Sequence, residues 1–245
     1  MTDVAQERQG IYLSVIVPAY NEEKRLGDTL KIINDFLKQQ NYSAEIIVVD
    51  DGSTDKTVGV AENLHIGILN IVKHGRNLGK GAAIRNGIIA SRGEVMLFTD
   101  ADNSTPIEEV AKLIEAINEG YDVAIGSRAL PESDIVLHQP WYRETMGRVF
   151  NLLVRLLVLT GIKDTQCGFK LFKSEVARIV FKEQQLSGFA FDVEVLLLAR
   201  KHGYRIKEVP IRWINSPASR VSPHRDALKM FKDIVRLRHL YGRRF

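Results

Sequence analysis

The sequence predicts an α/β fold, in which helices cover both faces of a mostly parallel sheet and amphipathic helices follow at the C-terminal end. Strand and helix patterns alternate through the first half of the chain, which is the order of repeated βα units. The expected strands are nearly continuous apolar runs, as in strands that are buried on both faces. With 245 residues, the chain is long enough for one large domain with a buried core.

Five strands and four helices are expected in the first half. The first helix has the clearest pattern, because Leu26, Leu30 and Ile33 recur at the spacing of one helix face. Thr105 and Glu108 flank Pro106 with the spacing of a capping box, which predicts a helix from there to about residue 119. The expected strands cover residues 13–17, 45–49, 68–72, 95–99 and 123–126, and the expected helices cover residues 26–37, 56–64, 82–91 and 105–119.

The second half predicts fewer strands and longer helices. We expect an apolar, partly basic helix over residues 142–162 and a late strand over residues 208–213. The last helix, residues 226–240, is amphipathic. Its apolar face carries Ala227, Met230, Phe231, Ile234, Leu237 and Tyr241, and its polar face carries Lys229, Lys232 and Arg236. No repeat, low-complexity segment or linker is visible, so residues 1–245 are expected to form a single domain.

Charge and composition restrict the partners. The net charge is +4, and residues 220–245 contain eight Lys or Arg against two Asp. This basic end predicts an anionic partner, which leaves phospholipid, nucleic acid and a phosphorylated substrate open. Cys167 is the single cysteine, so an internal disulfide is excluded and a reducing cytoplasmic compartment is favoured. Neither a signal peptide nor an apolar stretch of bilayer-spanning length is visible.

Polar or flexible residues follow every expected strand of the first half. In an open parallel sheet, ligands bind beyond the carboxyl ends of the strands, so these segments should meet in one crevice. They are residues 18–23, 50–53, 75–81, 100–102 and 127–128.

Two of these segments carry paired aspartates. Asp100 and Asp102 follow a buried strand and can ligate one hard cation, Mg²⁺ or Mn²⁺, that also binds a diphosphate. The alternative is that they form a turn or cap the next helix. Asp50 and Asp51 can cap the helix that follows them, or can accept hydrogen bonds from a ribose or a base.

The remaining candidates are open to two interpretations each. Gly79, Lys80 and Gly81 form either a flexible turn or a helix start that approaches phosphate, without the spacing of a Walker A loop. Asp192 and Glu194 either begin a helix or face an acceptor. Cys167 is expected to be a packed small side chain, since no adjacent base is evident. The histidines show no zinc-binding spacing.

These segments, in this order, resemble the inverting family 2 glycosyltransferases, which have the Rossmann-like GT-A fold. Further along, residues 164–170 (Asp-Thr-Gln-Cys-Gly-Phe-Lys) and 191–194 (Phe-Asp-Val-Glu) are similar to the polyprenyl-phosphate branch of that family. They are most similar to its dolichyl-phosphate glucosyltransferases, and less so to the dolichol-phosphate mannose synthases. The matching segments of the first half are residues 15–23, 48–55, 77–81, 100–102 and 126–128.

The resemblance implies a nucleotide-sugar-binding half (11–130), an acceptor half (131–225) and a basic amphipathic C-terminal helix (226–245). Asp100 and Asp102 would hold Mg²⁺ or Mn²⁺. A third protein ligand is in doubt, because Asn103 and Ser104 replace the Leu-Gln pair of the mannose synthases. The nucleotide-sugar-binding residues would be Pro18, Ala19, Tyr20, Glu22, Asp50, Asp51, Gly79, Lys80, Asp100 and Ala101, and the catalytic residues Asp102, Arg128, Arg143 and Arg220.

The expected reaction is transfer of a hexose, with glucose from UDP-glucose favoured, onto a polyprenyl or dolichyl phosphate. Such an acceptor is already anionic, so arginines matter more than a general base. We expect peripheral contact with the cytoplasmic face of a membrane through the helices at 142–162 and 226–240, and no nucleic-acid partner.

Three alternatives remain. The donor is GDP-mannose, or the acceptor is a glycan hydroxyl, which requires a base among Asp164, Asp192 and Glu194. A nucleotide-sugar-binding module without turnover is the third, and the intact Asp100–Asp102 pair argues against it. The absence of a Gln-x-x-Arg-Trp element argues against a processive polysaccharide synthase.

Overall fold

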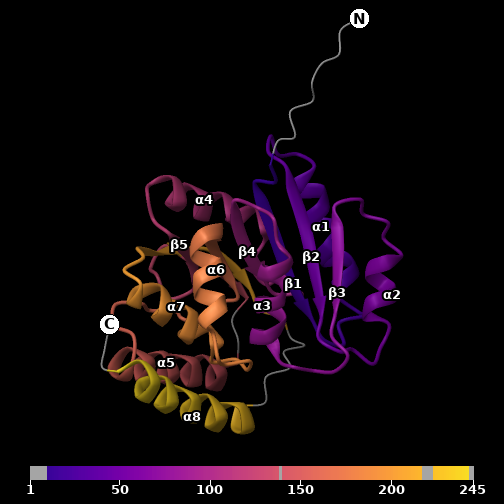
Figure 1. Cartoon of the computed structure of the whole chain (residues 1–245). Helices are drawn as coiled ribbons and strands as arrows, with labels where there is room; N and C mark the ends of the chain where they lie inside the picture. The colour runs from indigo at the N-terminus through magenta and orange to yellow at the C-terminus, as the bar shows by residue number, and fades with distance from the viewer. Residues whose placement is uncertain (1–9, 138–139, 217–222, 243–245) are drawn as a thin grey trace, which may run out of the picture.

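The computed structural model describes residues 10–137, 140–216 and 223–242, with the backbone alone for residues 141–143 and 223–229. Its centre is a seven-stranded sheet in which β7 is antiparallel to both of its neighbours and the other strand pairs are parallel. The mostly parallel sheet expected from the sequence is therefore confirmed. In spatial order (Figure 1) the strands are β3 (Leu69–Lys73), β2 (Ala44–Asp50), β1 (Leu13–Ala19), β4 (Val95–Thr99), β7 (Phe169–Lys173), β5 (Val123–Ser127) and β8 (Ile206–Pro210).

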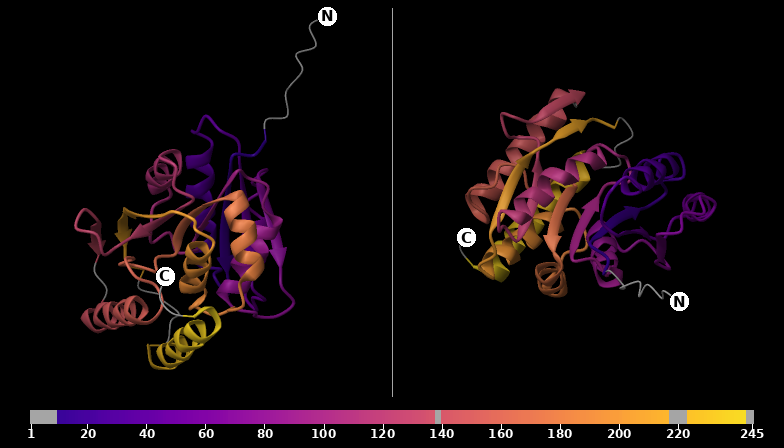
Figure 2. Two further views of the ribbon diagram at one scale, coloured as in Figure 1. Left: turned by 60° about the vertical axis from the view of Figure 1, so that its left-hand side comes forward. Right: turned by 90° about the horizontal axis from the view of Figure 1, so that it is seen from above.

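Helices cover both faces of this sheet, as expected (Figures 1 and 2). One layer contains α1 (Leu26–Leu37), α2 (Thr57–Glu62) and α4 (Val110–Asn118), and the other contains α3 (Lys80–Ala90), α6 (Ser174–Glu183) and α7 (Phe191–Lys201). Side chains alternate across the sheet, so Val15 and Val17 of β1 join the core under α1 while Ile16 joins the opposite core under α3. Both cores are continuous along the sheet, which holds the strand ends rigidly.

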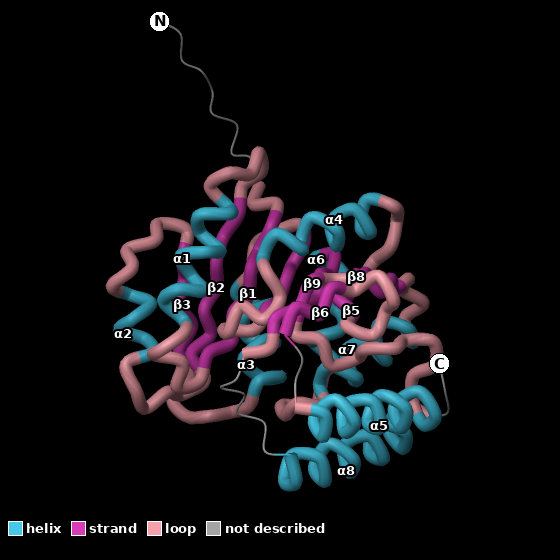
Figure 3. Tube along the Cα trace, turned by 180° about the vertical axis from the view of Figure 1, so that it is seen from behind, coloured by secondary structure: helices cyan, strands magenta, loops and turns pink. Residues whose placement is uncertain are grey.

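Two further helices, α5 (Trp141–Leu157) and α8 (Pro223–Tyr241), lie side by side at the end of the molecule near the carboxyl ends of the strands (Figures 1 and 3). Val154 of α5 and Leu237 of α8 are buried in the core shared with α6 and α7. Within the described part of the chain, no helix has the length and apolar character needed to cross a membrane. The exposed apolar side chains of this pair are Val149, Leu152 and Leu156 on α5, and Phe231, Val235 and Leu240 on α8.

The second half contains elements that the sequence pattern did not predict. β7 and α6 were missed, because Lys170 and Lys173 interrupt the apolar run of β7. The helix expected over residues 142–162 ends at Leu157, since Val158 leaves the helical region with φ −132°. The strand expected over 208–213 is two strands: β8 pairs with β5, while β9 (Arg212–Ile214) pairs with β6 (Asp134–Leu137) in a separate parallel pair.

The capping box expected at Thr105 is not formed. Pro106 is still extended, with ψ 139°, and a short 3₁₀ turn, η1 (Ile107–Glu109), precedes α4 without a side-chain cap. The start of α2 also differs from expectation, because the Asp55 carboxylate accepts the hydrogen bond from the Thr57 N–H at 3.0 Å. Asp55, and not Asp50 or Asp51, is therefore the aspartate that binds the N-terminal turn of α2.

Candidate active site

A cavity of about 700 Å³ opens at the carboxyl ends of the strands. It brings together side chains that are far apart in the sequence, from β1, α3, β4 and the segment after β5. Eleven of the site residues expected from the sequence line it: Pro18, Ala19, Tyr20, Glu22, Asp51, Gly79, Lys80, Asp100, Ala101, Asp102 and Arg128.

Three expected residues are not placed in the cavity. Asp50 is buried behind its wall, and its Oδ2 accepts a hydrogen bond from the Ser53 N–H at 3.2 Å. Its Oδ1 is buried without a hydrogen-bond partner within the described part of the chain. The side chain of Arg143 and the whole of Arg220 lie outside the described residues. The roles of all these residues toward a ligand stay predictions.

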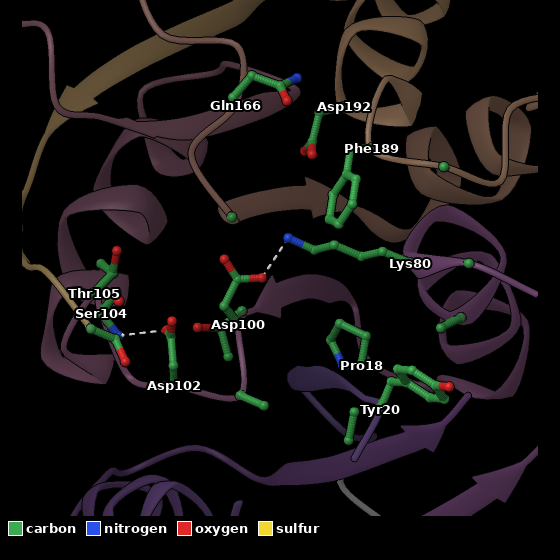
Figure 4. A pocket seen from close by; sticks show the side chains of 18 of the residues that line it. Pro18, Tyr20, Lys80, Asp100, Asp102, Ser104, Thr105, Gln166, Phe189 and Asp192 are labelled. Atoms are coloured by element: carbon green, nitrogen blue, oxygen red, sulfur yellow. Dashed lines mark hydrogen bonds and ion pairs between the residues drawn. The ribbon is translucent and has the colours of Figure 1, made fainter. Parts of the chain in front are cut away.

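The Asp100 carboxylate is positioned by a neighbouring glycine and a lysine. A Cβ at position 168 would lie 2.1 Å from Asp100 Oδ2, so the carboxylate occupies the space that Gly168 leaves. The Lys80 Nζ lies 2.5 Å from the other oxygen, Asp100 Oδ1 (Figure 4). Asp100 therefore lines the cavity with a cation already bound to one of its oxygens.

Asp102 faces the same cavity from two positions further along. Asn103 adopts the left-handed region with φ 52°, which turns the chain so that the Ser104 N–H donates to Asp102 Oδ1 at 3.0 Å. The Arg25 Nη1 lies 3.8 Å from Asp102 Oδ2. Asp102 is thus oriented by the backbone, and it lies near a guanidinium that binds Glu22 at 2.7 Å.

These two carboxylates fit a divalent cation that is shared with a ligand. Carboxylate oxygens are the donors that Mg²⁺ and Mn²⁺ prefer, and these ions keep open positions for phosphate oxygens. Among the described residues no group of three or more His, Cys, Asp or Glu could hold a metal ion. The pair therefore suits a cation whose coordination is completed by a diphosphate.

Asp51 also lines the cavity and holds a turn of the backbone there. Its buried carboxylate accepts hydrogen bonds from the Leu78 and Gly79 N–H groups, each at 2.8 Å, and lies 2.7 Å from the His74 Nδ1. Gly79 has φ 100°, a conformation that favours glycine, and a Cβ there would lie 2.4 Å from the Ser187 carbonyl oxygen. Asp51 therefore holds the turn from which α3 and Lys80 begin.

Lys80 lies close to three carboxylates, those of Asp100, Asp102 and Asp192. Burial favours its neutral form, but the charges of Asp100, Asp192 and Asp102 outweigh burial and raise the pKa of Lys80 above its usual value. Lys80 is therefore a permanent cation at neutral pH.

Arg128 and Asp164 form the most complete ion pair of the site. The Arg128 Nε and Nη2 donate to the two oxygens of Asp164 at 2.7 and 2.9 Å, and the Arg128 N–H adds a third bond at 3.0 Å. Burial opposes the charged carboxylate, but Arg128 outweighs it and lowers the pKa of Asp164 to about 2. The guanidinium also lies 5.5 Å from the Trp213 ring, which keeps it at the mouth of the cavity.

Lys170 is a functional candidate that sequence reasoning missed. Its Nζ is buried and donates at 2.5 Å both to Asp192 Oδ1 and to the Cys167 carbonyl oxygen. Burial raises the pKa of Asp192, and the charge of Lys170 opposes that rise. A lysine between Phe169 and Leu171 is the signal in the sequence, whereas nothing in the pattern marks Gly168.

The third acceptor-side carboxylate, Glu194, is also engaged. It accepts hydrogen bonds from the Gln185 and Leu186 N–H groups at 2.9 and 2.7 Å and from the Tyr241 hydroxyl at 2.9 Å. It lies in α7 and does not line the cavity. Glu194 therefore fixes the loop that carries Ser187 and Phe189 rather than facing a substrate.

The model of the family described as "Glycosyl transferase family 2" matches residues 14–181. The chain belongs to glycosyltransferase family 2. Its relatives include proteins named dolichyl-phosphate beta-glucosyltransferase from Dictyostelium discoideum and Homo sapiens. The first is 40% identical over 94% of this chain and 75% of its own length, and the second is 38% identical over 94% and 76%.

Solved structures support the fold of this glycosyltransferase. Glucosyl-3-phosphoglycerate synthase from Mycobacterium tuberculosis, in complex with Mn²⁺, UDP and phosphoglyceric acid, has a TM-score of 0.71 at 21% identity, covering 95% of this chain and 79% of that one. Mannosyl-3-phosphoglycerate synthase from Rubrobacter xylanophilus has a TM-score of 0.70 at 21% identity, covering 94% and 73%. The GT-A fold implied by the sequence resemblance is confirmed.

Gly168→Ala should disable the site without unfolding the protein. The added methyl group would overlap the Asp100 carboxylate, and a shift of about 1 Å in a positioned group costs about a hundredfold in rate. Initial transfer rates and melting curves of the purified variant measure the two effects. Gly59→Ala, where a Cβ meets nothing within 4 Å, is the matched control and should keep full activity. A fully active Gly168→Ala enzyme would contradict the geometry.

Cys167 should be inert to alkylation in the folded enzyme. Burial raises the pKa of its thiol to about 11, so at pH 8 the side chain is the unreactive thiol. Iodoacetamide labelling at pH 8 should be more than about a hundredfold slower than in urea. Ile89→Cys in a Cys167→Ala background places a thiol on an exposed helix position and should react rapidly. Fast native labelling of Cys167 would show that it is an accessible thiolate.

Proposed function

We propose that this enzyme transfers glucose from UDP-glucose to a polyprenyl phosphate of the dolichyl type, with inversion at the anomeric carbon. The names of its relatives support the sugar and the acceptor. The observation that carries the proposal is the engagement of all three acceptor-side carboxylates. Asp164 is paired with Arg128, Asp192 with Lys170, and Glu194 with backbone N–H groups. Since none of these three carboxylates is free to act as a base in the described part of the chain, the arrangement suits an acceptor phosphate that is already ionised.

The donor would bind with its diphosphate over Asp100 and Asp102. Mg²⁺ or Mn²⁺ held by these carboxylates would neutralise charge on the leaving nucleoside diphosphate. The solved glucosyl-3-phosphoglycerate synthase is a complex with both Mn²⁺ and UDP, which supports this choice. Pro18 and Tyr20 at the end of β1 would contact the nucleoside, and Lys80 and Arg128 would place fixed positive charge beside the reacting phosphates.

The acceptor would approach from the side of α5 and α8. Met146 and Phe150 of α5 and Met230 of α8 line the cavity, so it extends to the helix pair. The outer surface of that pair combines the exposed apolar side chains of Val149, Leu152, Leu156, Phe231, Val235 and Leu240 with the exposed basic groups of Arg148, Lys232, Arg236 and Arg238. Apolar and basic groups on one helical surface suit the interface of an anionic leaflet. We therefore propose peripheral contact with the cytoplasmic face of a membrane, through which the lipid phosphate reaches the cavity.

The product identifies the reaction. With radiolabelled UDP-glucose, dolichyl phosphate in detergent and Mn²⁺, the label should pass into the organic phase as a β-linked glucosyl lipid. Asp102→Asn should lose at least about a hundredfold in rate, as when an electrostatic group that acts on the transition state is removed. Asp28→Asn, at a carboxylate whose side chain is 83% exposed on α1, removes the same charge elsewhere and should leave the rate unchanged.

Two results would overturn the proposal. Label that appears only in water-soluble acceptors would favour transfer to a glycan hydroxyl. Transfer from GDP-mannose but not from UDP-glucose would assign the enzyme to the mannose synthases instead.

A further inference from the structure

Four carboxylates around the reacting end of the cavity each have a lysine or arginine nearby, and one of these cations, Arg25, is shared with the carboxylate of Glu22, which it binds at 2.7 Å. Each of these four pairs joins residues from different parts of the chain. They are Asp100 with Lys80 at 2.5 Å, Asp192 with Lys170 at 2.5 Å, Asp164 with Arg128 at 2.7 Å and Asp102 with Arg25 at 3.8 Å. With Glu22 included, four cations stand against five carboxylates among these described groups, so an added dication would turn a small negative charge into a positive one.

Of the four ion pairs, the one between Lys80 and Asp100 occupies a carboxylate oxygen that a metal ion would need. Both carboxylate oxygens of Asp100 lie beside Gly168, and the ammonium of Lys80 lies 2.5 Å from one of them, Oδ1. A divalent cation bound to the same oxygen at about 2.1 Å would be next to that ammonium, and like charges at such distances repel strongly. Cation and lysine therefore exclude each other at Asp100.

The backbone of Lys80 is fixed, but its ammonium group can leave Asp100. Its backbone is clamped on one side by Asp51, through the Gly79 N–H at 2.8 Å, and on the other by the Ser187 carbonyl, which accepts from the Gly81 N–H at 2.8 Å. Its side chain is a flexible stem with a compact charge, and no other hydrogen bond of its ammonium is described in the structure. Lys170 contrasts with it, since two acceptors hold that ammonium in a fully buried place.

We propose that Lys80 is the resident counter-ion of Asp100 and that it yields this carboxylate to the metal only when a nucleoside diphosphate arrives to receive the ammonium. A dication and the doubly charged diphosphate of a nucleotide sugar together bring no net charge. The net charge of the site is therefore unchanged when both enter together. The inference rests on the proposed role of Asp100 and Asp102 as metal ligands. It assigns to Lys80 the coupling between metal loading and donor binding.

The coupling can be measured without turnover. Free Mn²⁺ has an electron paramagnetic resonance signal that falls on binding, so titrations with and without UDP give the Mn²⁺ affinity of each state. The wild-type enzyme should bind Mn²⁺ weakly alone and more tightly with UDP, by about tenfold or more. Lys80→Met removes the competing charge, and should bind Mn²⁺ alone about tenfold more tightly while gaining less from UDP.

Matched variants separate this effect from general charge and from damage. Lys112 is an exposed lysine of α4 that pairs with Glu109 of η1. Lys112→Met removes the same charge as Lys80→Met and should leave Mn²⁺ binding unchanged. Lys80→Arg keeps the charge and should keep weak binding of Mn²⁺ alone. A folding defect weakens metal binding, so a gain in affinity cannot arise from damage. If circular dichroism shows that Lys80→Met is unfolded, Lys80→Gln provides the same titration.

The outcomes distinguish the two levels of the proposal. Unchanged or weaker binding of Mn²⁺ alone in folded Lys80→Met or Lys80→Gln, with Mn²⁺-dependent UDP binding intact in the wild type, overturns the counter-ion role and leaves the proposed function standing. Failure of the wild type to bind UDP in a Mn²⁺-dependent way overturns both.

Discussion

The pairing of β4 with the antiparallel strand β7 is the constraint on which the site depends. Its register places Thr99 opposite Phe169, and therefore brings the next residues, Asp100 and Gly168, together at the strand ends. Because position 168 has no side chain, the Asp100 carboxylate fits beside it at the end of the β4–β7 pair. The position of the proposed metal ligand is thus set by a hydrogen-bonded ladder of backbone groups rather than by a flexible loop.

Electrostatic balance is the second principle of this site. Its carboxylates are paired with lysines and arginines at short range, and at Asp164 the charge of Arg128 outweighs burial and lowers the pKa to about 2. Two of these pairs are geometrically fixed: Arg128 binds Asp164 through both nitrogen donors, and Lys170 is held by two acceptors. The Lys80 pair rests on one contact at the tip of a flexible stem. The site therefore combines two firmly held ion pairs with one cation, Lys80, that is held by a single contact.

The first half of the fold and most of the donor side were predictable from sequence. The strands there are parallel, all but the edge strand β3 are buried on both faces, and polar residues follow them directly, so strand pattern and cavity-lining residues coincide in short segments such as residues 95–102. Asp100, Asp102 and Lys80 were found because each belongs to such a segment. Asp51 was found as well, but its contacts with Leu78 and Gly79 depend on a loop 27 residues away, which no local pattern encodes.

The second half resisted prediction for a physical reason. β7 carries Lys170 at a buried position, and a short strand pattern interrupted by a lysine suggests a surface element unless its partner is known. That partner, Asp192, comes from α7, and the pair exists only after the tertiary structure has formed. The same holds for Asp164 and Glu194, which the sequence left open as bases for a glycan acceptor and whose hydrogen bonds instead engage Arg128 and the backbone N–H groups of a loop.

Asp100 is expected to exchange Lys80 for a metal ion when the donor nucleotide binds. A crystal structure of the enzyme with Mn²⁺ and UDP, with the metal located by anomalous scattering, tests this exchange directly. Mn²⁺ should lie at about 2.0–2.3 Å from carboxylate oxygens of Asp100 and Asp102. The Lys80 ammonium should lie more than about 3.5 Å from Asp100 and within hydrogen-bond distance of the diphosphate. Mn²⁺ bound elsewhere, or bound at Asp100 with Lys80 still on that carboxylate, would contradict the exchange.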